Sequence, residues 1–164
     1  MTIINLIDAI TENFMEAMPG QPWAPKYSAD NQVTTYCNLF VNGVAKSLGY
    51  FSFWPSNLSN PLTANEIYAW VWSSSEWTQI TGDVAQAHAN SGAFVIAVQD
   101  GDPHGHVDVI MPGTMVNSTK WGKQVPKCCN VGAQIFIGKG VNWAFGDKEP
   151  NYFVLNSTVP KEVS

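Results

Sequence analysis

Cys37 and His106 are the two residues of this sequence best suited to nucleophilic chemistry. The hydrophobic spacing around Cys37 predicts that it lies in the first turn of a helix. Unpaired backbone N–H groups and the positive end of the helix dipole stabilise a thiolate there. The same spacing puts Cys37 on an apolar stripe with Phe40 and Val41, where a cysteine can equally be a core residue. Cys37 can therefore be assigned a catalytic role, and not only a packing role, if the sequence also offers a base.

His106 is the histidine whose setting fits a catalytic base. The segment Gly105-His106-Val107 places the imidazole at the start of a predicted strand, directly after a glycine-rich turn. From the mouth of a strand the ring can face a helix N-terminus. His104 lies inside the turn, where nothing in the sequence holds its ring in one orientation, and His88 is most simply a surface residue of a predicted helix.

A thiolate–imidazole pair needs a third group that fixes the ring by accepting a hydrogen bond from the nitrogen facing away from sulfur. We expect Asn130 in this role, because it is polar at the head of an apolar run predicted to form the next strand. Asp108, two residues beyond His106 on the same strand face, is the rival, and Asn117 is a weaker one. The alternative interpretation is that Asn130 is only a turn residue before its strand and has no catalytic role.

Stabilising the oxyanion of the reaction requires two hydrogen-bond donors. The backbone N–H of Cys37 is the natural first donor. Asn31, Gln32 and Tyr36 are candidates for the second, although each is also explained as a loop or cap residue.

No metal or other cofactor is expected. The three cysteines and three histidines never occur at a ligand spacing such as Cys-x₂-Cys or His-Glu-x-x-His. Cys128 and Cys129 are adjacent, a spacing at which a disulfide is strained, so a disulfide framework is not expected either.

The elements that must position these residues follow from periodicity, caps and turn residues. The predicted helices come first and most of the predicted strands afterwards, which favours an α+β fold with helices packed on one face of an antiparallel sheet. Thr34-Thr35 is expected to cap the helix of Cys37, and Thr63 with Glu66 forms a capping box. The predicted helices are 2–18, a segment ending at Leu48, 64–72 and 83–90, and the predicted strands are 93–99, 107–111, 131–137 and 151–155.

Composition narrows the class of protein. The chain has 164 residues, of which 45% are hydrophobic and 13% charged, which fits a single folded domain spanning 1–164. The net charge of −5 leaves no basic surface for nucleic acid. No apolar run is long enough for a membrane span, and the N-terminal residues lack the basic region of a secretory signal peptide. Neither nucleic acid nor membrane is an expected partner.

Four segments together resemble the NlpC-type and CHAP-type cell-wall hydrolases, especially those associated with phages or delivered as effectors. They are Thr35–Asn38, Gly105–Val107, Asn130–Gly132 and Leu62–Glu66, in the order Cys, His, polar that these enzymes show. The resemblance covers about residues 30 to 155, which would form the catalytic core. It implies a papain-like fold in which Cys37 is the nucleophile, His106 the base and then acid, and Asn130 the orienting group.

One departure concerns the substrate pocket. The usual NlpC-type motif is Asp-Cys-Ser-Gly, whereas this chain has Tyr36-Cys37-Asn38-Leu39. The departure bears on the shape of the pocket and leaves the nucleophile unchanged.

The resemblance implies hydrolysis of an amide bond in peptidoglycan peptides. Without a signal sequence, the protein would reach the periplasm or cell wall through a phage lysis apparatus or a secretion system, as an antibacterial toxin. A delivered effector would have a cognate immunity protein as its partner. Two alternatives stay open, namely a papain-like protease, deamidase or transglutaminase that acts on a protein, and a catalytically inactive binding module.

Overall fold

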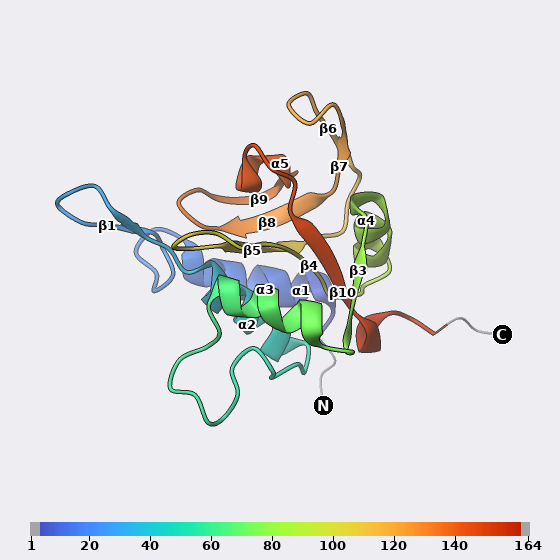
Figure 1. Cartoon of the computed structure of the whole chain (residues 1–164), viewed down its shortest axis with the longest axis horizontal. Coiled ribbons are helices and arrows are strands. Elements are labelled where there is room, and N and C mark those ends of the chain that lie inside the picture. Colours follow the sequence, from blue (N-terminus) through green and yellow to red (C-terminus); the bar gives the residue numbers. More distant parts are fainter. Residues whose placement is uncertain (1–3, 162–164) are drawn as a thin grey trace.

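The computed structural model describes residues 4–161 and has an α+β architecture in which every strand pair is antiparallel. Six strands form the main sheet in the order β3-β10-β4-β5-β8-β9, and two small hairpins, β1-β2 and β6-β7, stand apart from it. Helices α1, α2 and α3 lie together beside the sheet in Figure 1. The predicted class, helices packed on an antiparallel sheet, is confirmed.

All four predicted helices are formed. α1 (Leu6–Phe14) continues into a short 3-10 turn, and α3 (Ala64–Ser73) begins with the predicted capping box. α4 spans Gly82–Asn90. The first residues of the predicted 2–18 helix, 2 and 3, lie outside the described residues. A short helix, α5 (Asn142–Phe145), was not predicted.

The helix of Cys37, α2 (Cys37–Ser47), has the predicted end but a different start. Gly49 follows the C-cap with a φ of 88°, in the left-handed region where glycine is favoured. The N-cap is Tyr36, so the prediction of a Thr34-Thr35 cap was wrong. Thr34 is extended because it pairs with Lys26 in the β1-β2 hairpin.

The main sheet contains the strands that position the candidate site residues His106, Asp108 and Asn130. β5 (His106–Ile110) lies between β4 and β8, and the last strand of the chain, β10, is inserted between β3 and β4. Val109 pairs with Cys129 across β5 and β8. The other main-sheet strands are β3 (Trp77–Ile80), β4 (Val95–Gln99), β8 (Lys127–Val131), β9 (Ile135–Gly140) and β10 (Asn151–Leu155).

The predicted strand 131–137 was wrong, because it covers the turn between two strands. β8 ends at Val131 and β9 begins at Ile135, with Gly132 in the turn. Apolar residues lie on both sides of this turn, at Val131 and at 135–137, and the prediction joined them into one strand although Gly132 and Gln134 separate them. Asn130 is consequently the last but one residue of β8 and does not open a strand.

The two small hairpins are β1 (Lys26–Tyr27) with β2 (Val33–Thr34), and β6 (Val116–Ser118) with β7 (Lys123–Val125). The β1-β2 hairpin extends from the body of the molecule at the left of Figure 1 and leads directly into α2. Its position beside the start of α2 makes it one wall of the site described below.

The buried apolar side chains form one core cluster between the sheet and its helices. α2 contributes Phe40, Val41 and Val44 to this cluster, each fully buried, and packs against β5 and β8. Helix α2 is therefore held rigidly over the strand that begins with His106. Among the helices within residues 4–161, none combines the length and the apolar character that crossing a membrane demands.

Candidate active site

Cys37 is the first residue of α2, and its side chain is buried except for 6% of its surface. The apolar stripe of α2 faces the core, as its spacing predicts, and Cys37 lies at the end of this stripe, where the helix reaches the surface. The thiol is therefore held by packing on one side and lines a cleft on the other.

No side chain caps the N-terminus of α2. Ordinarily a Ser, Thr, Asp or Asn at the N-cap accepts a hydrogen bond from the first-turn N–H groups. With Tyr36 in this position, those N–H groups remain available to donate to another acceptor. They suit a thiolate on Cys37 or the oxyanion formed when that thiolate attacks a carbonyl.

His106, the first residue of β5, lies beside Cys37, and the thiol helps to raise the pKa of the imidazole. Its side chain is 22% exposed. The ring packs against Phe145 of α5, with 5.0 Å between ring centroids, and its Cε1 faces Gly132. A Cβ at position 132 would lie 3.1 Å from Cε1, so glycine leaves room for the ring there.

Asn130 and Asp108 both contact the same nitrogen of His106. Nε2 lies 2.6 Å from Asn130 Oδ1 and 3.0 Å from Asp108 Oδ1. The amide of Asn130 is fixed in this orientation because its Nδ2 donates to the Gln134 carbonyl at 2.7 Å. Asn130 Oδ1 is therefore an acceptor, Nε2 carries a proton, and Nδ1 is the nitrogen left for the thiol.

Antiparallel pairing explains how Asn130 reaches His106 from the end of its strand. β5 and β8 pair as Val109↔Cys129 and Ile110↔Cys128. Extending this antiparallel register by one residue places Asp108 opposite Asn130, so the last residues of β8 lie beside the first residues of β5. The sequence predicted that Asn130 and His106 would be adjacent because each would begin a strand. Asn130 instead lies near the end of β8, but its side chain does contact His106.

Asp108 brings a buried negative charge to the site. It is fully buried, and neither carboxylate oxygen has a well-aligned hydrogen-bond donor among residues 4–161. Burial alone would lower the pKa of His106, but the Asp108 carboxylate and the contact with Cys37 outweigh it and hold that pKa well above its ordinary value. The arrangement therefore favours an imidazolium beside the thiol.

The other two cysteines have a different environment. Cys128 and Cys129 are fully buried in β8. Burial raises the pKa of both thiols, and the negative charge of Asp108 raises it further. Both are therefore held as neutral thiols, and Cys37 is the one cysteine of the described chain beside a histidine at a cleft.

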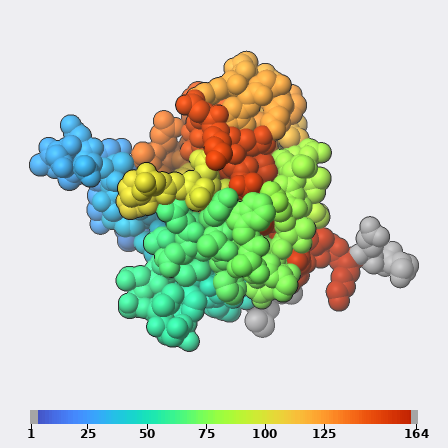
Figure 2. Space-filling view, viewed as in Figure 1, coloured from blue at the N-terminus to red at the C-terminus, as the bar shows by residue number. Residues whose placement is uncertain are grey.

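The cleft beside Cys37 has a volume of about 270 Å³. Three segments form its walls: the β2 strand and the residues after it, the start of α3, and the turn before His106. In Figure 2 the yellow turn lies at the surface between the blue N-terminal hairpin and the green α3. The lining residues are Val33, Thr34, Thr35, Cys37, Asn38, Thr63, Ala64, Asn65, Pro103, His104 and Gly105.

The structure does not bring the predicted side-chain oxyanion donors to this cleft. Asn31 is exposed in the turn of the β1-β2 hairpin with a φ of 63°, and Gln32 is its exposed neighbour. The ring of Tyr36 packs under the ammonium of Lys26, 5.4 Å from its centroid, outside the cleft lining. Asn117, the weaker candidate for the orienting role, lies in the β6-β7 hairpin.

Sequence reasoning missed Asn65. This residue lines the cleft from the first turn of α3 and holds the turn before His106 by three hydrogen bonds. The available signal was its place inside the Thr63–Glu66 capping box, where an asparagine serves neither as cap nor as a favourable helix residue.

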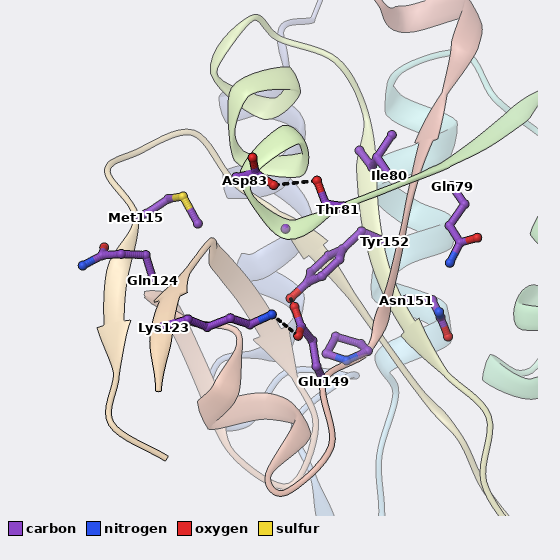
Figure 3. Close-up of a pocket in the computed structure, with 12 residues that line it drawn as sticks. Gln79, Ile80, Thr81, Asp83, Met115, Lys123, Gln124, Glu149, Asn151 and Tyr152 are labelled. Atoms are coloured by element: carbon purple, nitrogen blue, oxygen red, sulfur yellow. Dashed lines mark hydrogen bonds and ion pairs between the residues drawn. The ribbon is translucent and has the colours of Figure 1, made fainter. Parts of the chain in front are cut away.

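A larger cavity, of about 600 Å³, lies between β3, β7 and the start of β10 (Figure 3). Its polar groups pair with one another: Lys123 forms an ion pair with Glu149, the Tyr152 hydroxyl donates to Glu149 at 3.3 Å, and Thr81 donates to Asp83. Neither a cysteine nor a histidine lines it. Of the two, the smaller cleft is the one lined by a cysteine and a histidine.

No cluster of three or more His, Cys, Asp or Glu side chains suited to a metal ion occurs within the part of the chain that the structure describes. The donor set of the Cys37 cleft instead suits acyl transfer through a thiol.

The two acceptors on His106 Nε2 lead to a prediction that separates their roles. Asn130→Ala is expected to lower kcat by about 10-fold to 10³-fold with little change in KM, because the ring loses the neutral acceptor that orients it. Asp108→Asn is expected to lower the pKa of His106 toward its ordinary value, because the charge that stabilises the imidazolium is removed. Steady-state kinetics and an NMR titration of His106 would measure the two effects.

If Asn130→Ala were fully active while Asp108→Asn was inactive, the third place would belong to Asp108. An unchanged His106 pKa in Asp108→Asn would contradict the electrostatic role given to this carboxylate.

The chain matches no model of a known protein family and no curated protein.

Proposed function

We propose that this protein is a papain-like cysteine hydrolase that cleaves an amide bond in peptidoglycan peptides. One observation carries the hydrolase part: Cys37, at an uncapped helix N-terminus, lies beside a histidine whose other nitrogen contacts Asn130 and Asp108. A nucleophile, a base oriented by a third group, and free backbone donors are the parts that acyl transfer requires.

The reaction would proceed in two steps. The Cys37 thiolate attacks the amide carbonyl, and first-turn N–H groups of α2 stabilise the oxyanion. The imidazolium of His106 then donates its proton to the leaving amine, the C–N bond breaks, and a thioester remains on Cys37. Neutral His106 takes a proton from water, the hydroxide attacks the thioester, and the carboxylic acid is released as the imidazolium and thiolate form again.

Two arguments support peptidoglycan as the substrate. The motifs Thr35–Asn38 and Gly105–Val107 resemble those of NlpC-type and CHAP-type cell-wall hydrolases. Although the protein carries a net charge of −5, the described cleft lining contains no carboxylate and offers the hydroxyls of Thr34, Thr35 and Thr63. A peptide with several free carboxylates, such as a peptidoglycan stem peptide, would meet no like charge in this lining.

Digestion of purified sacculi tests the proposal. The wild-type protein is expected to release fragments that each carry one new amine and one new carboxylate, with the mass of one water added per cleavage. Mass spectrometry would identify the bond, and Cys37→Ala would be the matched control. Sacculi with diaminopimelate in the stem peptide and sacculi with lysine at the same position should both be included, because the two kinds of stem peptide differ there.

Release of no fragment above the Cys37→Ala background from either type of sacculus would reject peptidoglycan as the substrate. Should the protein instead hydrolyse or deamidate a protein substrate through Cys37, the thiol mechanism would stand and the alternative substrate class would replace the one proposed.

A further inference from the structure

The turn that leads into His106 is tied to the far wall of the cleft by a single side chain. Asn65 Nδ2 donates to the carbonyls of Gly101 and Pro103, at 2.9 and 3.2 Å. Asn65 Oδ1 accepts from the Gly101 N–H at 3.0 Å. One amide thus satisfies three backbone groups of the turn, and α3 is linked to the residues directly before the base.

The Asn65 side chain is available to hydrogen bond to the turn because Thr63 and Glu66 cap the helix. The Thr63 side chain accepts from the Glu66 N–H at 3.2 Å, and the Glu66 side chain accepts from the Thr63 N–H at 3.1 Å. Asparagine is a poor helix residue, so its presence in the first turn of α3 costs stability that a leucine or alanine would not. The three hydrogen bonds to the turn offset that cost.

The turn itself is packed so closely that two of its positions need glycine. A Cβ on Gly105 would collide with Asn65 Oδ1 and with the Gln99 carbonyl, and a Cβ on Gly101 would collide with the His104 carbonyl. Gly105 directly precedes His106, which pairs with Gln99 across β4 and β5. The backbone of the turn is therefore held by hydrogen bonds and close packing.

We propose that Asn65 is a positioning residue that fixes the 101–105 turn. By fixing this turn it holds the His106 ring against Cys37, and it keeps His104 at the cleft wall. Asn65 hydrogen bonds to the turn and not to either reacting side chain, so its effect passes through the backbone. This inference rests on the proposed Cys–His chemistry. A displacement of about 1 Å between reacting groups lowers a rate by about 10²-fold, so a looser turn should be costly.

The test compares Asn65→Ala with Glu66→Ala. Both substitutions alter the first turn of α3, but Glu66→Ala removes half of the capping box and leaves the turn contacts intact. It should lower Tm by about 2 to 4 °C without affecting the site. Asn65→Asp keeps the acceptor for the Gly101 N–H but turns a carboxylate oxygen toward the carbonyls of Gly101 and Pro103, so it should not restore the contacts.

Two readouts need no peptidoglycan: the rate at which iodoacetamide alkylates Cys37 at pH 6, and an NMR titration of His106. Asn65→Ala is expected to slow alkylation by about 10-fold and to displace the His106 titration, because the imidazolium no longer holds the thiolate. Asn65→Asp should be alkylated no faster than Asn65→Ala, and Glu66→Ala should match the wild type. In a substrate assay, kcat should fall by about 10-fold to 100-fold and KM should change less.

The inference would be overturned if Asn65→Ala, like Glu66→Ala, showed the alkylation rate and the His106 titration of the wild type. Equal losses in both variants would also overturn it, since helix stability would then be the cause. The two proposals fail separately. Failure to digest sacculi, with Cys37 alkylation still dependent on Asn65, would reject the substrate and leave the positioning role in place.

Discussion

Cys37→Ala is expected to abolish hydrolysis, with kcat lowered by at least about 10⁴-fold, because the variant lacks the only thiol at the cleft among the described residues. The fold should persist. The substitution removes one sulfur atom at the end of the α2 stripe, and a loss of roughly 1 kcal/mol in the free energy of unfolding is expected. Activity on sacculi and urea unfolding followed by circular dichroism would measure the two effects.

Cys129→Ala is the matched control, because it makes the same substitution at a fully buried cysteine that pairs with Val109 in the sheet. It should lose some stability and keep its activity. Iodoacetamide at pH 6 should label Cys37 in the wild type and leave Cys128 and Cys129 unmodified, since burial raises the pKa of both thiols. Wild-type turnover by Cys37→Ala, or an inactive but folded Cys129→Ala, would show that the nucleophile is assigned wrongly.

His106→Ala is expected to lower kcat by at least about 10³-fold, because it removes both the proton acceptor and the cation that stabilises the thiolate. His104→Ala is the matched control on the same turn. His104 is exposed at the cleft wall, so its loss should raise KM and change kcat by less than about 10-fold. The opposite ranking of the two variants would refute the assignment of the base.

The raised pKa of His106 also predicts how stability depends on pH. The folded protein binds the His106 proton more tightly than the unfolded chain does, so the stabilisation is fully present below the ordinary histidine pKa of about 6.5. It is lost as the pH rises through the higher folded-state value. The measurement is best made in a Cys37→Ala background, where the thiol no longer titrates, by urea unfolding at a series of pH values.

In that background, adding His106→Gln should remove the part of the decline above pH 6.5 that this residue causes. The difference between the two curves cancels the titration of Cys128, Cys129 and the remaining groups. Parallel curves for the two variants would contradict the ion pair between His106 and Asp108.

Local signals in the sequence determined most of the elements. The apolar spacing of α1, the Thr63–Glu66 capping box of α3 and the Gly49 stop of α2 each act within one or two turns of chain, so they could be read without knowing the fold. The strands β4, β5 and β10 were predicted in the same way. The pairing of a cysteine at a helix start with a histidine at a strand start also came from the sequence, because both positions are defined locally.

The errors fall where pairing overrides the local pattern. The 131–137 segment is mostly apolar, and Gly132 within it was not recognised as the point where the chain reverses after Val131. Thr34 looks like a cap, but the hairpin pairing with Lys26 holds it in an extended strand and leaves Tyr36 at the helix start. β3 was not predicted, since four residues become a strand through their pairing with β10 at the end of the chain.

Only the tertiary structure decided which groups surround the ring of His106. Antiparallel register brings Asn130 from the end of β8 to the start of β5, and the alternation along β5 puts Asp108 at the same ring nitrogen. Asn65 reaches the turn from 36 residues away in the sequence. A sequence determines which residue types can do the chemistry, but side-chain distances depend on register and packing between segments far apart, which act through space and leave no local pattern.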